Sequence, residues 1–153
     1  MANYVKGVDD QLLIFMVEGE KHALYLSHVD KVEFAVEISP LPEAPLSILG
    51  TINWRGQVLP VMSMRKRLHR NDKKVHKNDR LLIVQYSRRR MALLVDEVVG
   101  IVQVKSLEIT SADSVSEGLG CVMGLLPIDG GILSIHDTDL FLNEEEEKKL
   151  EAL

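Results

Sequence analysis

Short apolar runs separated by turn-forming residues constrain the fold of this chain more than any other feature of its sequence. Residues 11–17, 22–26 and 91–95 are three such runs, and each has the length of a strand rather than of a typical helix. Hydrophobic residues make up 46% of the chain and aromatic residues only 5%, so valine, isoleucine and leucine must fill the core. Glycine, proline and asparagine turns divide the chain into about nine or ten predicted strands, a pattern typical of small β-barrels.

The spacing of the turns predicts hairpins grouped into two lobes. Turns at residues 18–21 and 87–90 each join two apolar runs, and Asp129-Gly130-Gly131 is a strong hairpin signal. A chain of 153 residues has the size of one compact domain. We expect one domain over residues 10–143, built from two β-barrel lobes. The first five strands would close one barrel and the next four or five the other.

The C-terminal end changes to helical patterning. Asn143 can cap a helix, and Glu146, three positions later, completes a capping box. We therefore predict a helical tail over residues 144–153. We interpret its EEEEKK run as a solvated helix face without a specific function.

Charge and cysteine usage exclude several classes of protein. A formal net charge of −5 argues against general binding to phosphate backbones. The one cysteine, Cys121, excludes an intramolecular disulfide and lies in an apolar run, which predicts a buried small side chain. The first ten residues lack the basic lead and apolar core of a signal peptide, and no apolar run approaches the roughly 20 residues that span a bilayer. We expect a soluble, cytoplasmic protein without direct membrane insertion.

No arrangement of reactive residues predicts catalysis, so we expect no enzyme activity. The sequence holds no glycine-rich phosphate loop, no nucleophile elbow and no dinucleotide fingerprint. Its histidines show no pair at a zinc-site spacing, and each is predicted to lie on a strand surface or in a loop. They are His22, His28, His69, His76 and His136. We accordingly expect no catalytic residue, no metal and no cofactor.

A basic run over residues 65–80 supports an alternative function, that of a nucleic-acid-binding β-barrel protein. Its cations are Arg65, Lys66, Arg67, Arg70, Lys73, Lys74, Lys77 and Arg80, interrupted by Asp72 and Asp79. No aromatic residues are interleaved for base stacking, and the whole chain is acidic. A solvated loop that faces an acidic protein is therefore favoured, with no nucleic acid as partner. The chain has the profile of an interaction module.

Residues 50–68, GTINWRGQVLPVMSMRKRL, read as a strand, a tight turn, a strand and a short basic helical segment. Ile52 and Trp54 alternate with polar residues, as in a half-buried strand. Arg55 and Gly56 interrupt the alternation, and Gly56 can take a positive φ without steric cost. The turn would hold an always-protonated guanidinium at the surface. On spacing alone, this is a surface hairpin with an incidental arginine.

The same stretch resembles the signature of CheW-type chemotaxis coupling domains. The matching residues stand in the order G-x-x-N-x-R-G-x-x-x-P-V-x-x-x-R and are Gly50, Asn53, Arg55, Gly56, Pro60, Val61 and Arg65. The similarity extends over residues 12–142 and includes the closing pattern MGLLPIDGGILSIHDTDLF. It implies an all-β fold of two packed, five-stranded SH3-like barrels with short helices and a C-terminal helix.

The resemblance also implies a function. Members of this family are non-catalytic adaptors of chemotaxis signal transduction. They couple the cytoplasmic tip of a chemoreceptor (a methyl-accepting chemotaxis protein) to the regulatory domain of the histidine kinase CheA. A groove between the barrels takes the receptor helix, and helix-in-groove recognition needs only aliphatic residues and an anchoring charge.

Matching positions supply the candidate residues for binding the receptor and the kinase. Arg55 matches the receptor-proximal arginine, and Gly50 and Gly56 shape its corner. The candidates for the groove are Val32, Leu81, Leu94, Val98 and Ile101.

One candidate position departs from the family pattern. Many members carry a glutamate, able to pair with the arginine, two residues after the valine that Val32 matches, and this chain has Phe34 there. Glu33 or Glu37 can substitute for it. Glu33 is the weaker candidate, because adjacent strand positions point to opposite faces.

Overall fold

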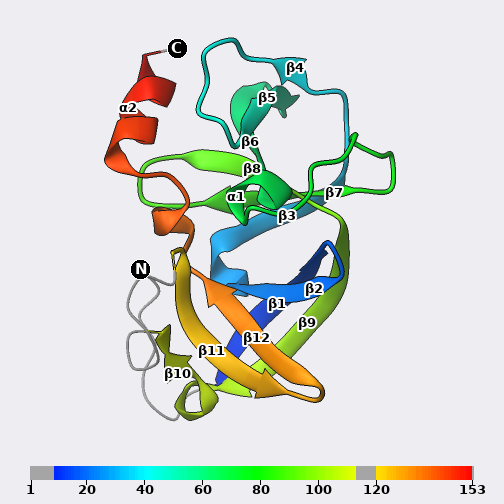
Figure 1. Cartoon of the computed structure of the whole chain (residues 1–153), viewed down its shortest axis with the longest axis vertical. Helices are drawn as coiled ribbons and strands as arrows, with labels where there is room; N and C mark the ends of the chain where they lie inside the picture. Colours follow the sequence, from blue (N-terminus) through cyan, green and yellow to red (C-terminus); the bar gives the residue numbers. More distant parts are fainter. Residues whose placement is uncertain (1–8, 113–119, 153) are drawn as a thin grey trace.

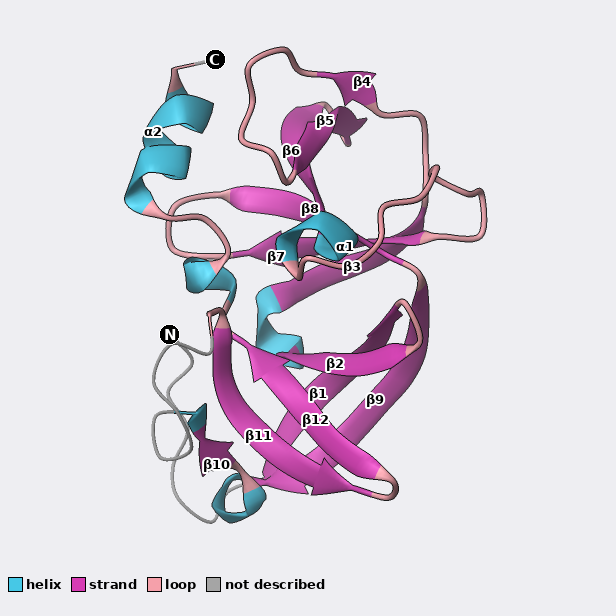
Figure 2. Ribbon diagram, in the orientation of Figure 1, coloured by secondary structure: helices cyan, strands magenta, loops and turns pink. Residues whose placement is uncertain are grey.

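Two six-stranded sheets, each curled into a barrel-like lobe, make up the computed structural model, which describes residues 9–112 and 120–152 (Figures 1 and 2). The first barrel has the strand order β10-β11-β12-β2-β1-β9 and the second the order β3-β7-β8-β6-β5-β4. Each sheet has one strand more than the expected five, and each contains one strand of only two residues, β10 or β4.

The strands of the first barrel are β1 (Asp9–Val17), β2 (Glu20–Tyr25), β9 (Glu97–Lys105), β10 (Thr110–Ser111), β11 (Val122–Ile128) and β12 (Gly131–His136). Those of the second are β3 (Val29–Phe34), β4 (Ser39–Pro40), β5 (Ile48–Trp54), β6 (Gln57–Ser63), β7 (Arg80–Gln85) and β8 (Arg90–Val95). The helices are η1 (Leu26–His28), α1 (Met64–Arg67), η2 (Ser106–Glu108), η4 (Thr138–Leu140) and α2 (Glu144–Glu151). No helix in the described ranges is long and apolar enough to cross a membrane.

The division of the chain between the barrels differs from the sequential one that we predicted. The chain starts in the first barrel with β1 and β2, builds the whole second barrel from β3 to β8, and returns to the first with β9. The antiparallel pairing of β1 with β9 joins the two segments of the chain that form the first barrel, with Leu12 opposite Val102. Hairpin signals report only neighbouring strands, so they could not reveal this long-range pairing.

Three apolar clusters hold the molecule together. One fills the first barrel and includes Leu12 and Ile135, and a second fills the other barrel and includes Leu81 and Val61. The third lies between the barrels and takes Leu82. Neighbouring residues of β7 thus face two different cores, which explains why its sequence is continuously apolar instead of alternating.

Ion pairs reinforce the packing between the barrels. Arg65, in α1 of the second barrel, donates hydrogen bonds to both carboxylate oxygens of Asp96, at 3.0 and 2.7 Å. It also lies 3.4 Å from Glu18 in the β1–β2 turn, and the Glu18 amide donates to Asp96 over 2.7 Å. Burial alone would raise the pKa of Asp96, but the hydrogen bonds from Arg65 and Glu18 lower it below its ordinary value. The carboxylate therefore stays charged and joins the two lobes.

The predicted C-terminal helix forms as α2. The side chain of Asn143 accepts a hydrogen bond from the Glu146 amide over 2.7 Å, and the Asn143 amide donates one to the Glu146 carboxylate over 3.0 Å, which completes the capping box. Our interpretation of the acidic run as purely solvated is wrong for Glu147. That side chain is buried, accepts a hydrogen bond from the Tyr86 hydroxyl over 2.7 Å and pairs with Arg89 over 3.0 Å.

Candidate functional site

The β5–β6 hairpin turn presents Arg55 at a rigid corner of the second barrel. Trp54 pairs with Gln57, so the loop consists only of Arg55 (φ 52°) and Gly56 (φ 82°). Two consecutive positive φ values define a type I′ turn, whose twist matches that of the flanking strands. The Gly56 amide donates to Asn53 Oδ1 over 2.9 Å, which explains the asparagine of the motif. The left-handed conformation of Arg55 costs about 1 kcal/mol, which the hairpin must offset.

The guanidinium of Arg55 lies over the ring of Trp54, with Cζ 4.7 Å from the ring centroid. Arg90 of β8 lies against the same ring at 5.4 Å and is held by Asp30 at 2.7 Å and Gln57 at 3.0 Å. Within residues 9–112 and 120–152, Arg55 makes no ion pair. Its exposed charge is therefore available to a carboxylate from another molecule.

Neither predicted substitute carboxylate pairs with Arg55. Glu33 accepts a long hydrogen bond of 3.5 Å from Trp54 Nε1, and Glu37 lines a surface cleft formed with residues 74–77. Phe34, at the position of the expected glutamate, is 62% exposed and carries the guanidinium of Arg80 at 3.9 Å from its ring centroid. A cation–aromatic contact thus stands where an acid–base pair was expected.

The structure separates the remaining groove candidates by burial. Val32 and Ile101 are 37% and 54% exposed. Leu81 is completely buried in the second barrel, and its cross-strand partner Leu94 packs against the same cluster. Val98 packs against the cluster between the barrels. Leu81 consequently has no surface with which to contact a partner, because its side chain points into the barrel.

The exposed candidates lie on different sheets. Val32 and Phe34 belong to β3, an edge strand of the second barrel, whereas Ile101 belongs to β9, an edge strand of the first. Figure 1 shows β3 beside the first barrel, where the two lobes meet. Glu33 of β3 reaches Trp54, whereas Val32 and Phe34 alternate with Glu33 along the strand and project from its opposite face. A partner that contacts all the exposed candidates would have to cross from one barrel to the other.

Other motif residues have structural roles. At Gly50, which is buried, a Cβ atom would lie only 2.0 Å from the carbonyl oxygen of Ser39, so no larger residue fits without moving β4. Val61 is completely buried in the second barrel. Arg65 joins the barrels through Asp96. The signature therefore describes the architecture as much as a binding surface.

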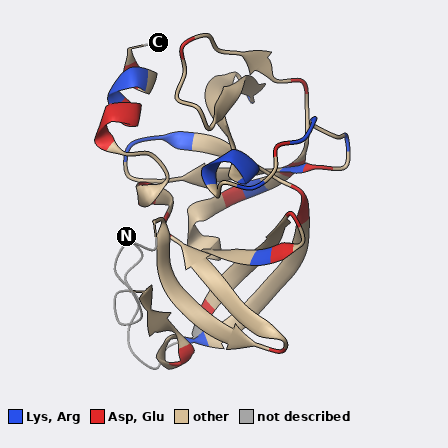
Figure 3. Ribbon diagram, in the orientation of Figure 1, with Lys and Arg blue, Asp and Glu red and all other residues tan. Residues whose placement is uncertain are grey.

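Most cations of the basic run are engaged within the molecule. Figure 3 shows blue and red segments alternating along α1 and the loop that follows it. Arg67 donates to the carbonyl of Phe141, Arg70 pairs with Glu20, and Lys73 pairs with Asp79 over 2.7 Å. Nucleic-acid binding requires cations that are free to meet phosphates. This pairing removes much of the basis for the nucleic-acid alternative.

Comparison with known proteins identifies the family. A family model described as the CheW-like domain matches residues 11–146. The chain belongs to the CheW-like family. Two relatives, each named chemotaxis protein CheW, are those of Bacillus subtilis (31% identical over 103 residues, 67% of this chain and 66% of that protein) and Rhizobium meliloti (27% over 149 residues, 95% and 96%).

A solved structure agrees with the fold. The crystal structure of the scaffolding protein TtCheW from Thermoanaerobacter tengcongensis matches with a TM-score of 0.82 at 24% identity, covering 91% of this chain and 96% of that one. The predicted fold class, two packed barrels with short helices and a C-terminal helix, is confirmed. At this identity the likeness concerns the fold alone.

Two residues that surround Arg55 were not among the predicted candidates. Trp54 forms the platform on which Arg55 rests, and Arg90 flanks it from β8. The sequence offered one signal for Trp54, since it is the only tryptophan and directly precedes the turn arginine. Nothing near Arg90 in the sequence points to the turn, because β8 follows 35 positions later (Arg90 against Arg55).

A buried row of three side chains, one thiol and two imidazoles, has the spacing of a catalytic cysteine–histidine pair but not its pKa values. Cys121 Sγ lies 3.0 Å from His136 Nδ1, and His136 Nε2 lies 2.9 Å from His22 Nδ1. All three side chains are buried, which confirms the prediction for Cys121 and corrects the surface placement of His22 and His136. Burial raises the pKa of the thiol and lowers that of both imidazoles. These shifts oppose a thiolate–imidazolium pair.

These histidines predict a dependence of stability on pH. Burial, assisted by His22 and Arg67, lowers the pKa of His136 from 6.5 to about 3. Between these values the unfolded chain binds a proton that the folded chain does not, so stability falls as the pH falls below 6.5. His136 alone would remove about 2 kcal/mol between pH 7 and pH 5. We expect urea denaturation to show this loss, and a smaller loss in His136→Gln. Equal stability of the wild type at pH 7 and pH 5 would contradict the assignment.

Proposed function

We propose that this chain is a non-catalytic adaptor of chemotaxis signalling, which couples the cytoplasmic tip of a chemoreceptor to the regulatory domain of the histidine kinase CheA. Membership of the CheW-like family supports the signalling role. The observation that carries the proposal is the Arg55 guanidinium, which is held on a two-residue turn and pairs with no carboxylate of the described ranges. The proposal places the protein in the cytoplasm, where both partners present these domains.

On the receptor side, the proposed surface combines an anchoring charge with exposed apolar side chains. Val32, Phe34 and Ile101 offer the aliphatic and aromatic contacts, and Arg55 would pair with a carboxylate of the receptor helix. An amphipathic helix recognised in this way buries one apolar face and needs few polar contacts. The more buried candidates would contribute indirectly, because their packing against the apolar clusters holds β7, β8 and β9 in place. They are Leu81, Leu94 and Val98.

Trp54 makes the arginine a stronger anchor than a freely moving side chain. Its ring restricts the guanidinium at 4.7 Å, so binding loses less side-chain entropy. Arginine and tryptophan together are also the residue types enriched at the centres of protein interfaces. The kinase would use other exposed surfaces of the barrels, which leaves the Arg55 turn to the receptor.

Charge reversal at the turn tests the receptor site. We expect Arg55→Glu to weaken binding to a soluble chemoreceptor-tip fragment by about tenfold or more, because attraction to a partner carboxylate becomes repulsion. Isothermal titration calorimetry against that fragment gives the affinity directly. Binding to the CheA regulatory domain should stay within about twofold of the wild type.

Lys149→Glu provides the matched control, since it changes the net charge equally at an exposed position of α2. The control should bind both partners like the wild type. If Arg55→Glu and Lys149→Glu bind the receptor fragment equally well, Arg55 is not its anchor. If the wild type binds neither partner, the adaptor function itself is wrong.

A further inference from the structure

A surface cleft of about 410 Å³ lies between two extended segments that are distant in sequence. Residues 35–38 connect β3 to β4, and residues 74–77 belong to the loop between α1 and β7. The Ala35 amide donates to the carbonyl of Asp79 over 3.0 Å and ties the two segments at one end. Beyond that bond the segments separate, and the cleft has the volume of a small ligand or peptide site.

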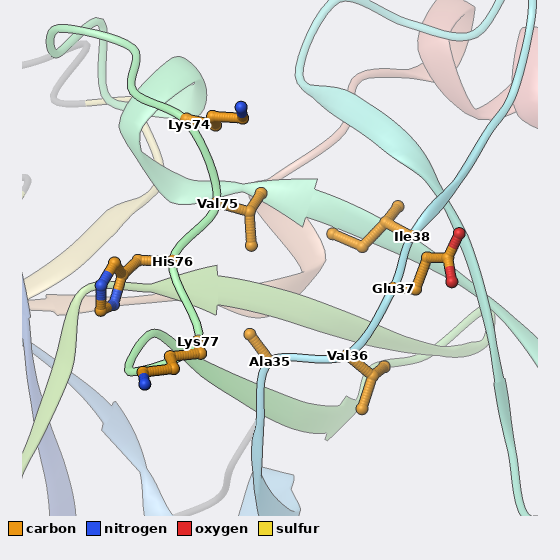
Figure 4. Close-up of a pocket in the computed structure, with 8 residues that line it drawn as sticks. All are labelled: Ala35, Val36, Glu37, Ile38, Lys74, Val75, His76 and Lys77. Atoms are coloured by element: carbon orange, nitrogen blue, oxygen red, sulfur yellow. The ribbon is translucent and has the colours of Figure 1, made fainter.

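Apolar side chains form the inner surface of the cleft. Figure 4 shows Ile38 and Val75 pointing toward one another across the gap, with Ala35 projecting into it. Val75 is 39% exposed, so apolar area faces water here, whereas Val36 is 51% exposed but points away from the gap in Figure 4. A ligand that covered this area would gain from its burial.

Hydrogen-bond donors predominate around this apolar surface. The backbone amides of Val36, Val75 and Lys77 donate no hydrogen bond to any residue of the described ranges. The ammonium groups of Lys74 and Lys77 likewise pair with no acidic side chain there, unlike Lys73, which is held by Asp79. The cleft has one carboxylate, Glu37; its side chain and that of Lys77 both point away from the gap in Figure 4, whereas Lys74 extends to the same side of its segment as Val75.

We infer that this cleft binds an extended acidic segment of a partner protein, in which an aliphatic side chain lies between carboxylates. Charge complementarity selects the acidic character, since two lysines that pair with no acidic side chain of the described ranges, Lys74 and Lys77, line the cleft against one glutamate. The amides of Val75 and Lys77, which donate to no residue of the described ranges, can pair with the backbone of an extended peptide, as in β-strand addition. The apolar surface takes the aliphatic side chain. The ring of His76, which belongs to the cleft lining, points away from the gap in Figure 4, so it offers no surface inside the cleft on which a nucleic-acid base would stack.

The site is separate from the Arg55 turn and does not depend on the adaptor function. Phe34 ends β3 immediately before the cleft, but neither Arg55 nor Trp54 lines it. An acidic segment could therefore occupy the cleft while the turn contacts another partner. Ala35 and Asp79 would brace its closed end, since the buried Asp79 is itself held by Lys73 and the His76 amide.

Fluorescence anisotropy with a synthetic peptide tests the inference. The probe is a fluorescein-labelled heptapeptide of alternating glutamate and valine, titrated with the full chain at low ionic strength. We expect saturable binding, weakened about tenfold by Lys74→Glu/Lys77→Glu. The control Lys148→Glu/Lys149→Glu changes the net charge equally at exposed positions of α2 and should bind within about twofold of the wild type.

Two further measurements separate the apolar and backbone contributions. A peptide with serine in place of valine should bind about fivefold more weakly, and Val75→Asp should weaken the valine peptide similarly. Amide NMR signals of Val36, Val75 and Lys77 should shift when the peptide is added, because these groups gain acceptors. Circular dichroism establishes that each variant is folded.

Several outcomes would overturn the inference. One is an absence of binding by the glutamate–valine probe at millimolar protein, and another is equal binding of a lysine–valine peptide. Undiminished binding by Lys74→Glu/Lys77→Glu would place the peptide elsewhere. Oligouridine or inorganic phosphate that competes at concentrations below the peptide's own dissociation constant would mark a phosphate site instead.

Discussion

Gly50→Ala is expected to destabilise the protein by on the order of 3 kcal/mol, a large share of the 5–15 kcal/mol of a typical domain. The new Cβ would lie 2.0 Å from the carbonyl oxygen of Ser39 and 2.8 Å from its carbonyl carbon. Both atoms are backbone, so the overlap can be relieved only by moving β4 away from β5, where Pro40 pairs with Gly50. The φ of 157° adds strain for any residue with a side chain. For a chain of this size we expect the melting temperature to fall by about 10 °C.

Gly131→Ala is the matched control for this substitution. A Cβ there meets nothing within 4 Å, and the residue opens β12 opposite Ile128. Its effect should stay below about 1 kcal/mol in urea denaturation. Equal losses for the two variants would show that the close approach of Ser39 does not determine the need for glycine at position 50.

Arg65→Met is expected to cost about 2–3 kcal/mol, because it leaves the largely buried Asp96 carboxylate without its bidentate partner. The side chains of Arg65 and Asp96 are only 18% and 21% exposed, so water replaces the lost bonds poorly. The pair joins the barrels, and its loss should lower the free energy of unfolding of the whole molecule in urea. Asp96 has a lowered pKa in the folded chain, so its contribution is present above its ordinary value of 3.8 and is lost as the pH falls through the folded pKa.

Arg88→Met serves as the comparison for the ion pair. Arg88 pairs with Glu144 at the surface, where the side chains are 39% and 73% exposed, and such pairs contribute about 1 kcal/mol or less. A double-mutant cycle of Arg65→Met with Asp96→Asn should give a coupling energy above about 1 kcal/mol. A coupling near zero, or a loss no larger than that of Arg88→Met, would show that the link between the barrels depends on apolar packing alone.

Local features of the fold could be predicted because their chemistry is local. The Arg55–Gly56 turn, the Asp129–Gly130 turn and the Asn143 cap all depend on neighbours within a few positions. The assignment of strands to barrels depends on pairs such as Leu12 with Val102, and apolar strands give no register signal over 90 residues. The resemblance to a known family predicted the two-barrel fold, but only the structure showed that the chain builds the second barrel before it completes the first.

The candidate site shows the same division. The motif identified Arg55 and its glycines, and the turn geometry follows directly from Gly56. The environment of Arg55 could not be predicted, since Trp54, Glu33 and Arg90 converge from three different strands. Nor could the sequence pattern show that Leu81 is buried inside the barrel and Phe34 is exposed, because both belong to apolar strand patterns.

The most direct test of the adaptor function asks whether one molecule of this protein can join both proposed partners. Analytical ultracentrifugation would follow a labelled chemoreceptor-tip fragment mixed with the CheA regulatory domain, with and without the chain. We predict that the receptor fragment sediments with the CheA domain only when the chain is present, and that Arg55→Glu removes the receptor fragment while the chain–CheA complex remains. An unchanged sedimentation of the receptor fragment in the complete mixture would contradict the account.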